Sequence, residues 1–460
     1  MLKKLLMVTL IAIFPVSASH LLEVCPNGVE YVKVYVDTNC TLSDGEGSID
    51  LNGSGIVYVA KNRSEFRRFF GFYPDYEFKG RFALANDGED IYIIQNGSVV
   101  DSFNWRDLYK DRGVIYYRTG GNWDFRYQDW TNFSLVEDNV SGVIIISPTD
   151  YRIEANKVVL ASYTLIDLPT DCSNVTIFLD GNPIGGVPMN EIVLSKRYDV
   201  TFLRSNSFKH FHWKFAVCDG NKVIITTENW KWSKVGYIVE FRSKKVADLL
   251  KSVLDHDKIY SVDVNRFSEA KTKIKVLRHG KSMHFRSKIG VFILPDCNPI
   301  FDLIKSAKRR LLIQAPYMGF EWFGDDRPLL NAIVNASRHV DVQIILSDRD
   351  KATKQILEDL AKVENLNLKV KTIENLHGKL IVVDDVAIIT SANLNKYGLK
   401  LNREVGIIIY SKDVADFLAK KFDEDWNGKK HDDMIYLTLS VILLLGALIV
   451  THKFIRWRFK

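Results

Sequence analysis

Two stretches of the chain, HWKFAVCD (212–219) and HGKLIVVD (377–384), share the spacing His-x-Lys-x4-Asp. Each is followed by a second apolar run that ends in a hydroxyl residue and an asparagine, within TTEN (226–229) and TSAN (390–393). One match to so short a pattern would carry little weight. Two matches with the same accessory residues at nearly the same offset indicate a duplicated unit.

The residue types in the two stretches suit the cleavage of a phosphodiester. A phosphodiester is negatively charged and repels nucleophiles, and two lysine ammoniums with two asparagine amides can offset that charge without a metal. In an extended strand, residues two apart share a face, so each His and Lys pair can point towards one phosphate. One imidazole can attack phosphorus, while the other protonates the leaving oxygen and then activates water. The sequence therefore predicts a two-step displacement that uses two histidines and no cofactor.

Both triplets, together with TTEN and TSAN, resemble the phospholipase D superfamily. The segment SANLNKYGLKLNREVGIII (391–409) is especially close to the second half of that family. The resemblance implies two α/β halves that form one site at their interface within a monomer. By motif position, it implies that His212 is the nucleophile and His377 is the general acid and base.

The same resemblance implies roles for the remaining motif residues. Glu404, in the family's Asn-x-Glu pattern at 402–404, is implied to orient a histidine. Asp219 and Asp384 complete the catalytic motifs, although aspartates at this position are more often architectural than chemical. The others hold the phosphate oxygens or occupy the family's serine position: Lys214, Lys379, Thr227, Asn229, Ser391 and Asn393. No metal ligand is implied.

The first half departs from the family pattern. Aligning KVGYIV (234–239) with EVGIII (404–409) places Lys234 where the second half has Glu404. This alignment leaves open which residue orients His212, and the candidate substitutes are Glu228 and Glu240. Every residue with a direct chemical role is retained, which argues against a degenerate, non-catalytic copy of the fold.

The length of 460 residues predicts more than one domain. Residues 19–135 contain short alternating runs separated by turn signals such as DG, NG and GSG, which predicts an all-β sandwich. EVCPNGVEYVKVY (23–35) and GIVYVAKN (55–62) resemble the lamin-tail domain, an immunoglobulin-like module. That resemblance implies a role in binding or attachment and no catalytic group.

Residues 140–288 are expected to form the first phospholipase D half with a basic linker, and residues 289–430 the second half. In the second half, apolar strand patterns alternate with amphipathic patterns, which predicts mixed sheets between helices. The expected helices are FDLIKSAKRR (301–310), LLNAIVNASRH (329–339) and ATKQILEDLAKV (352–363), and the first half offers KKVADLLKSVLD (244–255).

The two ends of the chain predict its location. Residues 1–18 have the basic start and apolar stretch of a secretory signal peptide. Residues 434–451 contain no charged residue and are long enough to cross a bilayer. The basic tail at 452–460 places the C-terminus in the cytoplasm by the positive-inside rule. The sequence therefore predicts a single-pass protein of the cell membrane whose domains lie outside the cell.

Five cysteines are too few for a disulfide scaffold and show no metal-ligand spacing. Cys25 with Cys40, and Cys172 with Cys218, are candidate bridges that the sequence does not assign.

The basic linker bears on the substrate. From Arg266 to Lys288 the chain has eight Lys or Arg residues against one acid, Glu269, which suits a polyanion such as DNA or RNA. Aromatic residues beside the first motif are candidates for stacking on bases: Phe211, Trp213, Trp230 and Trp232. A solvated basic connector and ordinary core aromatics are the open alternative.

Three functions follow from these patterns. The first is an extracellular, surface-tethered nuclease that forms a phosphohistidine intermediate. The second is a phospholipase D or phosphatidyl-transferase that acts on membrane lipids, since the predicted tether keeps the site near a bilayer. The third is a non-catalytic surface protein that binds anionic ligands.

Overall fold

The computed structural model describes residues 18–428, except residues 109, 120, 232–233, 273–279 and 324–325. The chain divides into two compact units, Met1–Thr131 with Phe323–Asp326, and Asn132–Trp322 with Arg327–Lys460. The predicted signal peptide (apart from residue 18), the predicted membrane segment and the basic tail lie outside the described residues. Within the described part, no helix is both long and apolar enough to span a membrane.

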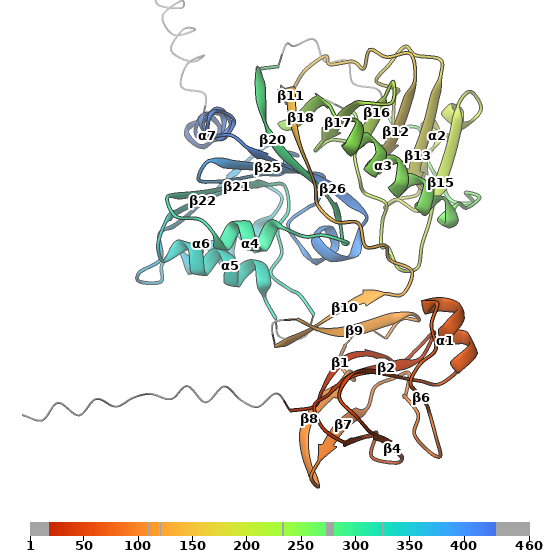
Figure 1. The fold of residues 1–460 in the computed structure, drawn as a ribbon. Helices are drawn as coiled ribbons and strands as arrows, with labels where there is room; N and C mark the ends of the chain where they lie inside the picture. Colours follow the sequence, from red (N-terminus) through yellow and green to blue (C-terminus); the bar gives the residue numbers. More distant parts are fainter. Residues whose placement is uncertain are drawn as a thin grey trace, which may run out of the picture. The chain divides into compact units, whose positions relative to one another are not determined.

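The N-terminal unit contains a six-stranded sheet in the order β10-β9-β1-β2-β5-β6 and a four-stranded sheet in the order β4-β3-β7-β8 (Figure 1). The helix α1 (Arg63–Phe70) follows β5. The strands are β1 (His20–Cys25), β2 (Tyr31–Val36), β3 (Cys40–Ser43), β4 (Ser48–Leu51), β5 (Gly55–Ala60), β6 (Tyr76–Glu77), β7 (Asp90–Gln95), β8 (Ser98–Asn104), β9 (Val114–Thr119) and β10 (Asn122–Tyr127).

Local sequence explains this β-rich unit. Asn96 and Gly97 have φ of 50° and 75°, as a two-residue hairpin turn between β7 and β8 requires. Val32, Val34 and Val36 alternate along β2 and are fully buried. All five cysteines are free, so the two candidate disulfides are not formed. An immunoglobulin-like or lamin-tail identity for this unit stays a prediction.

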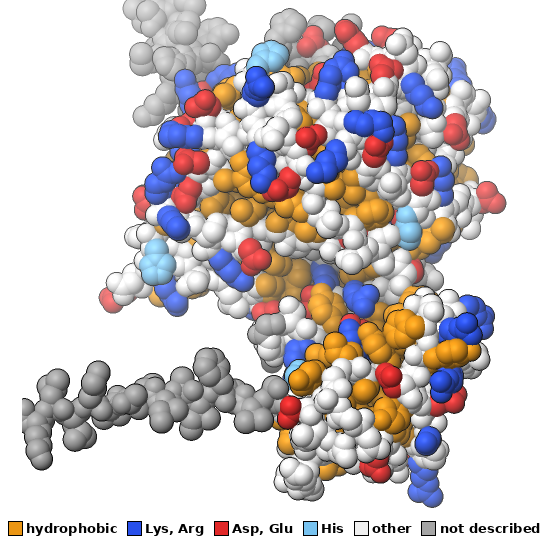
Figure 2. All heavy atoms as spheres, in the orientation of Figure 1, with side chains coloured by type: hydrophobic (Ala, Val, Ile, Leu, Met, Phe, Trp, Pro, Cys, Tyr) orange, Lys and Arg blue, Asp and Glu red, His pale blue; other side chains and the backbone are white. Residues whose placement is uncertain are grey.

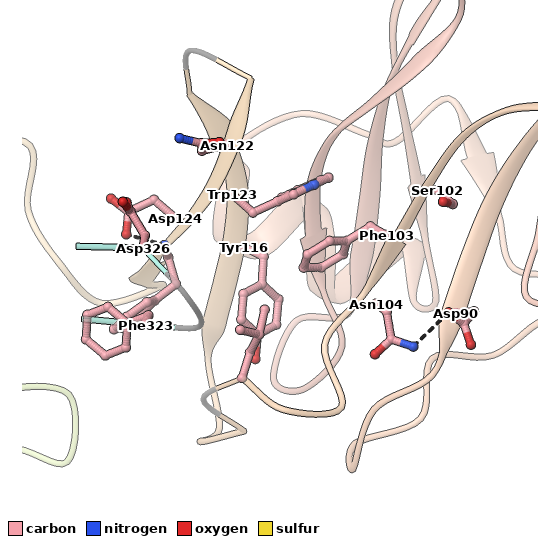
Figure 3. A pocket seen from close by; sticks show the side chains of 12 residues that line it. Asp90, Ser102, Phe103, Asn104, Tyr116, Asn122, Trp123, Asp124, Phe323 and Asp326 are labelled. Atoms are coloured by element: carbon pink, nitrogen blue, oxygen red, sulfur yellow. Dashed lines mark hydrogen bonds between the residues drawn. The ribbon is translucent and has the colours of Figure 1, made fainter. Parts of the chain in front are cut away.

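A pocket of about 390 Å³ lies in the N-terminal unit (Figure 3). The ring of Phe103 stacks on Trp123 with centroids 3.9 Å apart. Asn104 donates a hydrogen bond of 2.7 Å to Asp90, which also lines the pocket. No residue of either His-x-Lys motif lines it.

The larger unit is organised around one 14-stranded sheet (Figure 1). From its centre, one side runs β11-β18-β17-β16-β12-β13-β15, and the other runs β20-β26-β25-β24-β21-β22-β23. These orders match strand for strand, and the halves join where β11 pairs antiparallel with β20. The first-half strands are β11 (Val136–Ser147), β12 (Val158–Ser162), β13 (Val175–Asp180), β15 (Asp199–Leu203), β16 (Phe215–Cys218), β17 (Lys222–Thr226) and β18 (Gly236–Arg242).

The second half repeats the same order of pairing. Its strands are β20 (Ser282–Leu294), β21 (Arg310–Ala315), β22 (Asp341–Ser347), β23 (Leu368–Ile373), β24 (Leu380–Val383), β25 (Val386–Thr390) and β26 (Glu404–Tyr410). Short elements complete the unit: β14 (Val187–Pro188), β19 (Phe267–Ser268), the 3₁₀ turn η1 (Lys258–Tyr260) and the π-turn η2 (Tyr397–Leu401).

One long helix follows the last strand of each half. The Ser243 and Ser411 side chains accept hydrogen bonds from Val246 N and Val414 N, which caps α3 and α7. The helix predicted at 301–310 is shorter than expected and ends at Lys305, because β21 already begins at Arg310. The helices are α2 (Met189–Ser195), α3 (Lys244–Asp257), α4 (Ile300–Lys305), α5 (Pro328–Ser337), α6 (Lys351–Leu360) and α7 (Lys412–Asn427).

A buried ion-pair cluster fixes the chain just before β26. Arg403 is fully buried and donates to Asp257 at 2.8 and 3.0 Å and to Asp296 at 3.0 Å. Asp257 ends α3 in the first half, whereas Asp296 follows β20. The cluster therefore ties three segments that are distant in sequence to the residue preceding Glu404.

Replacing Arg403 with Met should lower the free energy of unfolding by about 3–5 kcal/mol, because two buried carboxylates lose their partner. The control is Lys354→Met, which breaks an exposed 3.4 Å pair with Glu358 and should cost about 0.5 kcal/mol or less. Urea unfolding measures both. Equal losses of unfolding free energy in the two variants would contradict a stabilising role of the buried cluster.

Candidate active site

The backbone around each motif histidine is held by the opposite half. The amide of His212 donates to the carbonyl of Arg403 at 2.9 Å, just before β26. The amide of His377 donates to the carbonyl of Val235 at 3.0 Å, just before β18. The two motifs, 165 positions apart (377 − 212) in the sequence, are thus each seated on the other half.

Side-chain contacts also cross between the halves. Lys379 Nζ donates to the carbonyl of Thr227 at 3.4 Å. Burial lowers the pKa of His377 well below its usual value, and the positive charges of Lys379 and Lys214 lower it further. A motif lysine of one half therefore acts on the motif histidine of the other, and the predicted groups converge on one site.

Glu404 holds the ring of His212. The Nδ1 atom of His212 lies 2.7 Å from Glu404 Oε1. Ser391 Oγ donates to Glu404 Oε2 at 2.5 Å, and Asn402 Nδ2 donates to Oε1 at 3.1 Å. Burial alone would raise the pKa of Glu404, but His212, Lys214 and Ser391 bring it below its usual value. An ionised Glu404 keeps the proton of His212 on Nδ1 and leaves Nε2 with a free lone pair.

The β-sheet register identifies the counterpart of Glu404 in the first half. Thr227 Oγ1 accepts a hydrogen bond from Tyr237 N at 3.0 Å. Ser391 Oγ accepts the equivalent bond from Val405 N, also at 3.0 Å. Since Thr227 and Ser391 occupy the same motif position, Tyr237 corresponds to Val405.

Gly236 therefore corresponds to Glu404, and Lys234 corresponds to Asn402. The alignment that placed Lys234 opposite Glu404 is wrong by two residues, because the shared Val-Gly letters do not follow the backbone hydrogen bonds. The residue that orients His212 is therefore Glu404, whose carboxylate contacts the ring of His212. The histidine without an equivalent glutamate is His377, because Gly236 occupies the position that would face it.

Glu228 occupies part of the space left by that glycine. A Cβ atom on Gly236 would lie 2.8 Å from Glu228 Oε1 and 2.9 Å from its Cγ. Ser147 Oγ donates to the same Oε1 at 3.1 Å. Burial raises the pKa of Glu228 to about 8, although Ser147 and Lys379 oppose the shift. Neither predicted substitute orients His212, since Glu240 instead accepts a hydrogen bond from Tyr151.

The basic groups of the site are held in a low-dielectric environment. Burial lowers the pKa of Lys214 to about 8, although Glu404 and Glu228 oppose the shift. Burial, followed by the charge of Lys214, lowers the pKa of Lys379 well below its usual value. Burial also lowers the pKa of His212 to about 4. A bound phosphate would favour the charged forms of all these groups.

The two motif asparagines have spare hydrogen-bonding capacity. The Oδ1 atoms of Asn229 and Asn393 are buried and have no partner among the described residues. Asn229 Nδ2 donates to Thr164 Oγ1 at 3.1 Å. Unsatisfied buried polar atoms are rare, and a matched pair beside two lysines suits a site for phosphate oxygens.

The motif aspartates do not face the site. Asp219 Oδ1 accepts from the amides of Asn156 and Lys157 at 3.0 and 2.9 Å. Asp384 accepts from three successive amides at 308–310. Both adopt a positive φ, 48° and 51°, at the turn that ends the motif strand. Their placement among the catalytic residues is therefore wrong, and they fix the backbone instead.

The aromatic residues beside the first motif belong to the core. Phe211, Trp213 and Trp230 are buried, with at most 5% of their surface exposed. Trp232 lies outside the described residues. The expectation that these rings stack on bases is wrong for the three that are described, because their rings are buried in the core.

Tyr163 is a site residue that the sequence patterns did not reveal. Its ring centroid lies 4.7 Å from that of His212, and Lys214 Nζ lies 5.9 Å from its centroid. Tyr163 directly follows β12, the strand beside the motif strand β16. The sequence feature that could have indicated Tyr163 is its position at the end of an apolar run, next to Thr164. Among the described residues, no cluster of three or more His, Cys, Asp or Glu could hold a metal ion.

Comparison with known proteins finds a family model that is similar to part of this unit. Residues 300–426 match the family model described as "Cardiolipin synthase, PLD-like domain". This match supports the phospholipase D resemblance for the second half.

The curated relatives match over limited lengths. The major cardiolipin synthase ClsA of Bacillus subtilis is 30% identical over 185 residues, which cover 36% of this chain and 37% of the relative. A cardiolipin synthase of Staphylococcus aureus is 32% identical over 130 residues, covering 27% and 25%. The chain thus spans about a third or less of the length of these relatives.

Solved structures are also similar. NucT from Helicobacter pylori aligns with a TM-score of 0.26 and 23% identity, covering 30% of this chain and 95% of that protein. Phosphatidylserine synthase of Haemophilus influenzae aligns with a TM-score of 0.45 and 13% identity, covering 66% and 93%.

Glu404→Gln should lower the pKa of His212 further below about 4, because the carboxylate raises it. Adding inorganic phosphate to the unsubstituted protein should raise it, since the anion favours imidazolium. NMR of the ring protons against pH measures both shifts. Glu240→Gln is the control and should leave His212 unchanged, whereas equal shifts in the two variants would contradict the role of Glu404.

Proposed function

We propose that the chain is a phosphodiester-cleaving enzyme of the phospholipase D type that forms a phosphohistidine on His212 without a metal ion. The observation that carries the proposal is the contact of 2.7 Å between His212 Nδ1 and the buried carboxylate of Glu404. Two motif lysines and two motif asparagines surround the same site. The match of residues 300–426 to a phospholipase D-like family supports this chemistry.

In the first step, His212 Nε2 attacks phosphorus and forms a P–N bond while the P–O bond to the leaving alcohol breaks. The carboxylate of Glu404 stabilises the positive charge that develops on the ring. Protonated His377 gives its proton to the leaving oxygen. Phosphate binding supplies the nearby negative charge that favours the protonated form of this ring.

In the second step, neutral His377 takes a proton from water as the water oxygen attacks phosphorus. The P–N bond breaks, His212 is restored, and a phosphate monoester leaves. An alcohol in place of water gives a new diester by the same proton transfers. Hydrolysis and transfer therefore use one arrangement of groups.

For the substrate, we propose a phospholipid headgroup ester. The named relatives are cardiolipin synthases, and three of the aromatic residues expected to stack on bases are buried. Two lysines of the basic linker are already paired, Lys281 with Glu424 at 2.6 Å and Lys288 with Glu137 at 2.8 Å. On the face drawn in Figure 2, basic side chains are interspersed with acidic ones.

Nucleic acid is the second candidate substrate. It is favoured by the exposed basic residues of the linker, which include Arg266, Lys271 and Arg286. A surface-tethered location outside the cell remains the proposal drawn from the two ends of the chain.

The proposal is tested with bis(p-nitrophenyl) phosphate in EDTA. His212→Ala should reduce turnover by about 1,000-fold or more, because the nucleophile is lost. His377→Ala should still release one equivalent of p-nitrophenol, which needs no acid, and then stall as an adduct on His212 that intact-mass spectrometry detects. Turnover that survives in His212→Ala, or that requires an added divalent metal, would rule out this mechanism.

The same assay distinguishes the two candidate substrates. Vesicles of phosphatidylglycerol or phosphatidylcholine, DNA and RNA are offered in EDTA, each beside His212→Ala. Cleavage of lipid alone confirms the proposed substrate, whereas cleavage of DNA or RNA alone replaces it with the second candidate.

With bis(p-nitrophenyl) phosphate, whose leaving group needs no proton from His377, the pH profile of kcat/KM should be bell-shaped. Activity should rise as pH increases through about 4, since His212 must be neutral to attack. It should fall as pH increases through about 8, since Lys214 must be charged to hold the phosphate. Lys214→Arg should move the alkaline limb to higher pH. Glu228 also has a pKa of about 8, and its charge raises the pKa of Lys214. Glu228→Gln should therefore keep the limb but move it to lower pH, opposite to Lys214→Arg, whereas loss of the limb would assign it to Glu228.

A further inference from the structure

A cavity of about 330 Å³ opens beside His377. Both halves line it, with Lys234 from the first and Tyr317, Arg349 and Glu374 from the second. His377 is the only motif residue in its lining. Any group bound there lies next to the imidazole that exchanges protons with the substrate.

The cavity lies beside the segment in which the two halves have different residues at equivalent positions. In the second half, Asn402 and Glu404 fill the corresponding positions and bond to each other at 3.1 Å. In the first half, these positions hold Lys234 and Gly236. Glu228 fills only the space beside the glycine, and Lys234, which has no carboxylate two residues after it, lines the cavity instead.

The cavity is lined by two basic side chains, Lys234 and Arg349, and by two carboxylates, Asp348 and Glu374. Neither Lys234 nor Arg349 forms an ion pair with a carboxylate in the described part of the chain. Lys234 is half-buried, whereas Arg349 is exposed. Because neither cation is held by a carboxylate, both keep their N–H donors for an anionic ligand group.

The rest of the lining suits hydroxyl groups. Asp348, Glu374 and Asn375 present acceptor oxygens, and the apolar contribution comes chiefly from Leu376 and the ring of Tyr317. A ligand that combines one anionic group with several hydroxyls would satisfy both sets. An acyl chain would leave the charged groups buried without partners.

We propose that this cavity binds the alcohol side of the substrate, and that this alcohol carries a second phosphate held by Lys234 and Arg349. The inference rests on the proposed function, because His377 protonates the leaving alcohol and must lie beside it. The chemistry is that of a phosphorylated polyol. A glycerol phosphate of a lipid and the adjoining nucleotide of a nucleic acid both have it.

Binding measured by calorimetry on the full-length chain in EDTA tests this subsite without requiring turnover. The probes are glycerol 1,3-bisphosphate against glycerol 3-phosphate, and thymidine 3′,5′-bisphosphate against thymidine 5′-monophosphate. A bisphosphate should bind about 10-fold more tightly than its monophosphate, as one charge-assisted contact predicts. The pair with the larger ratio identifies the source of the polyol.

Lys234→Met and Arg349→Met should each abolish most of this preference while the monophosphates bind as before. Lys305→Met removes an exposed lysine of α4 and is the matched control. Equal affinities for mono- and bisphosphates in the unsubstituted protein would overturn the inference. The inference would also be overturned if Lys234→Met lowered the affinity for a monophosphate and for its bisphosphate by the same factor.

The two proposals fail separately. Without His212-dependent turnover of bis(p-nitrophenyl) phosphate, the proposed function is lost, even if the bisphosphate preference is observed. With such turnover but no bisphosphate preference, only the subsite is lost.

Discussion

Two backbone hydrogen bonds that cross between the halves are the constraint on which the site depends. The amide of His212 is bound to the carbonyl of Arg403, and the amide of His377 to that of Val235. Neither half can therefore seat its own histidine. The antiparallel pairing of β11 with β20 joins the two sheets into one, and it thereby fixes the register in which both hydrogen bonds form. The buried ion pairs of Arg403 with Asp257 and Asp296 also hold the residue whose carbonyl accepts from His212.

The duplicated architecture contains a chemical asymmetry. His212 lies against the carboxylate of Glu404, whereas the equivalent position facing the other half is Gly236. The nearest replacement, Glu228, has its pKa raised to about 8 chiefly by burial. Two histidines in equivalent folds thus have different electrostatic surroundings, which is how a symmetric scaffold can divide the roles of nucleophile and acid.

Electrostatics also explains why the site suits an anion. Two buried lysines and two histidines repel one another, and burial disfavours their charged forms. Glu404 is the buried carboxylate whose pKa stays low, so the site offers more positive than negative charge. A phosphodiester supplies the missing charge at the position where the reaction takes place. The donors are already oriented, so little reorganisation is needed when it binds.

The sequence by itself determined the duplicated motifs, the β-rich start of the chain, most helices of the second half and the motif residues that meet at the site. These depend on local spacing, because residue types at fixed offsets set strand faces, turns and caps. Only the tertiary structure decided that Gly236 rather than Lys234 replaces Glu404, that Asp219 and Asp384 hold backbone amides, and that Phe211, Trp213 and Trp230 are core residues. Each of these follows from pairing between distant strands, and a shift of two residues in one strand preserves its alternation of faces, so the letters alone do not reveal it.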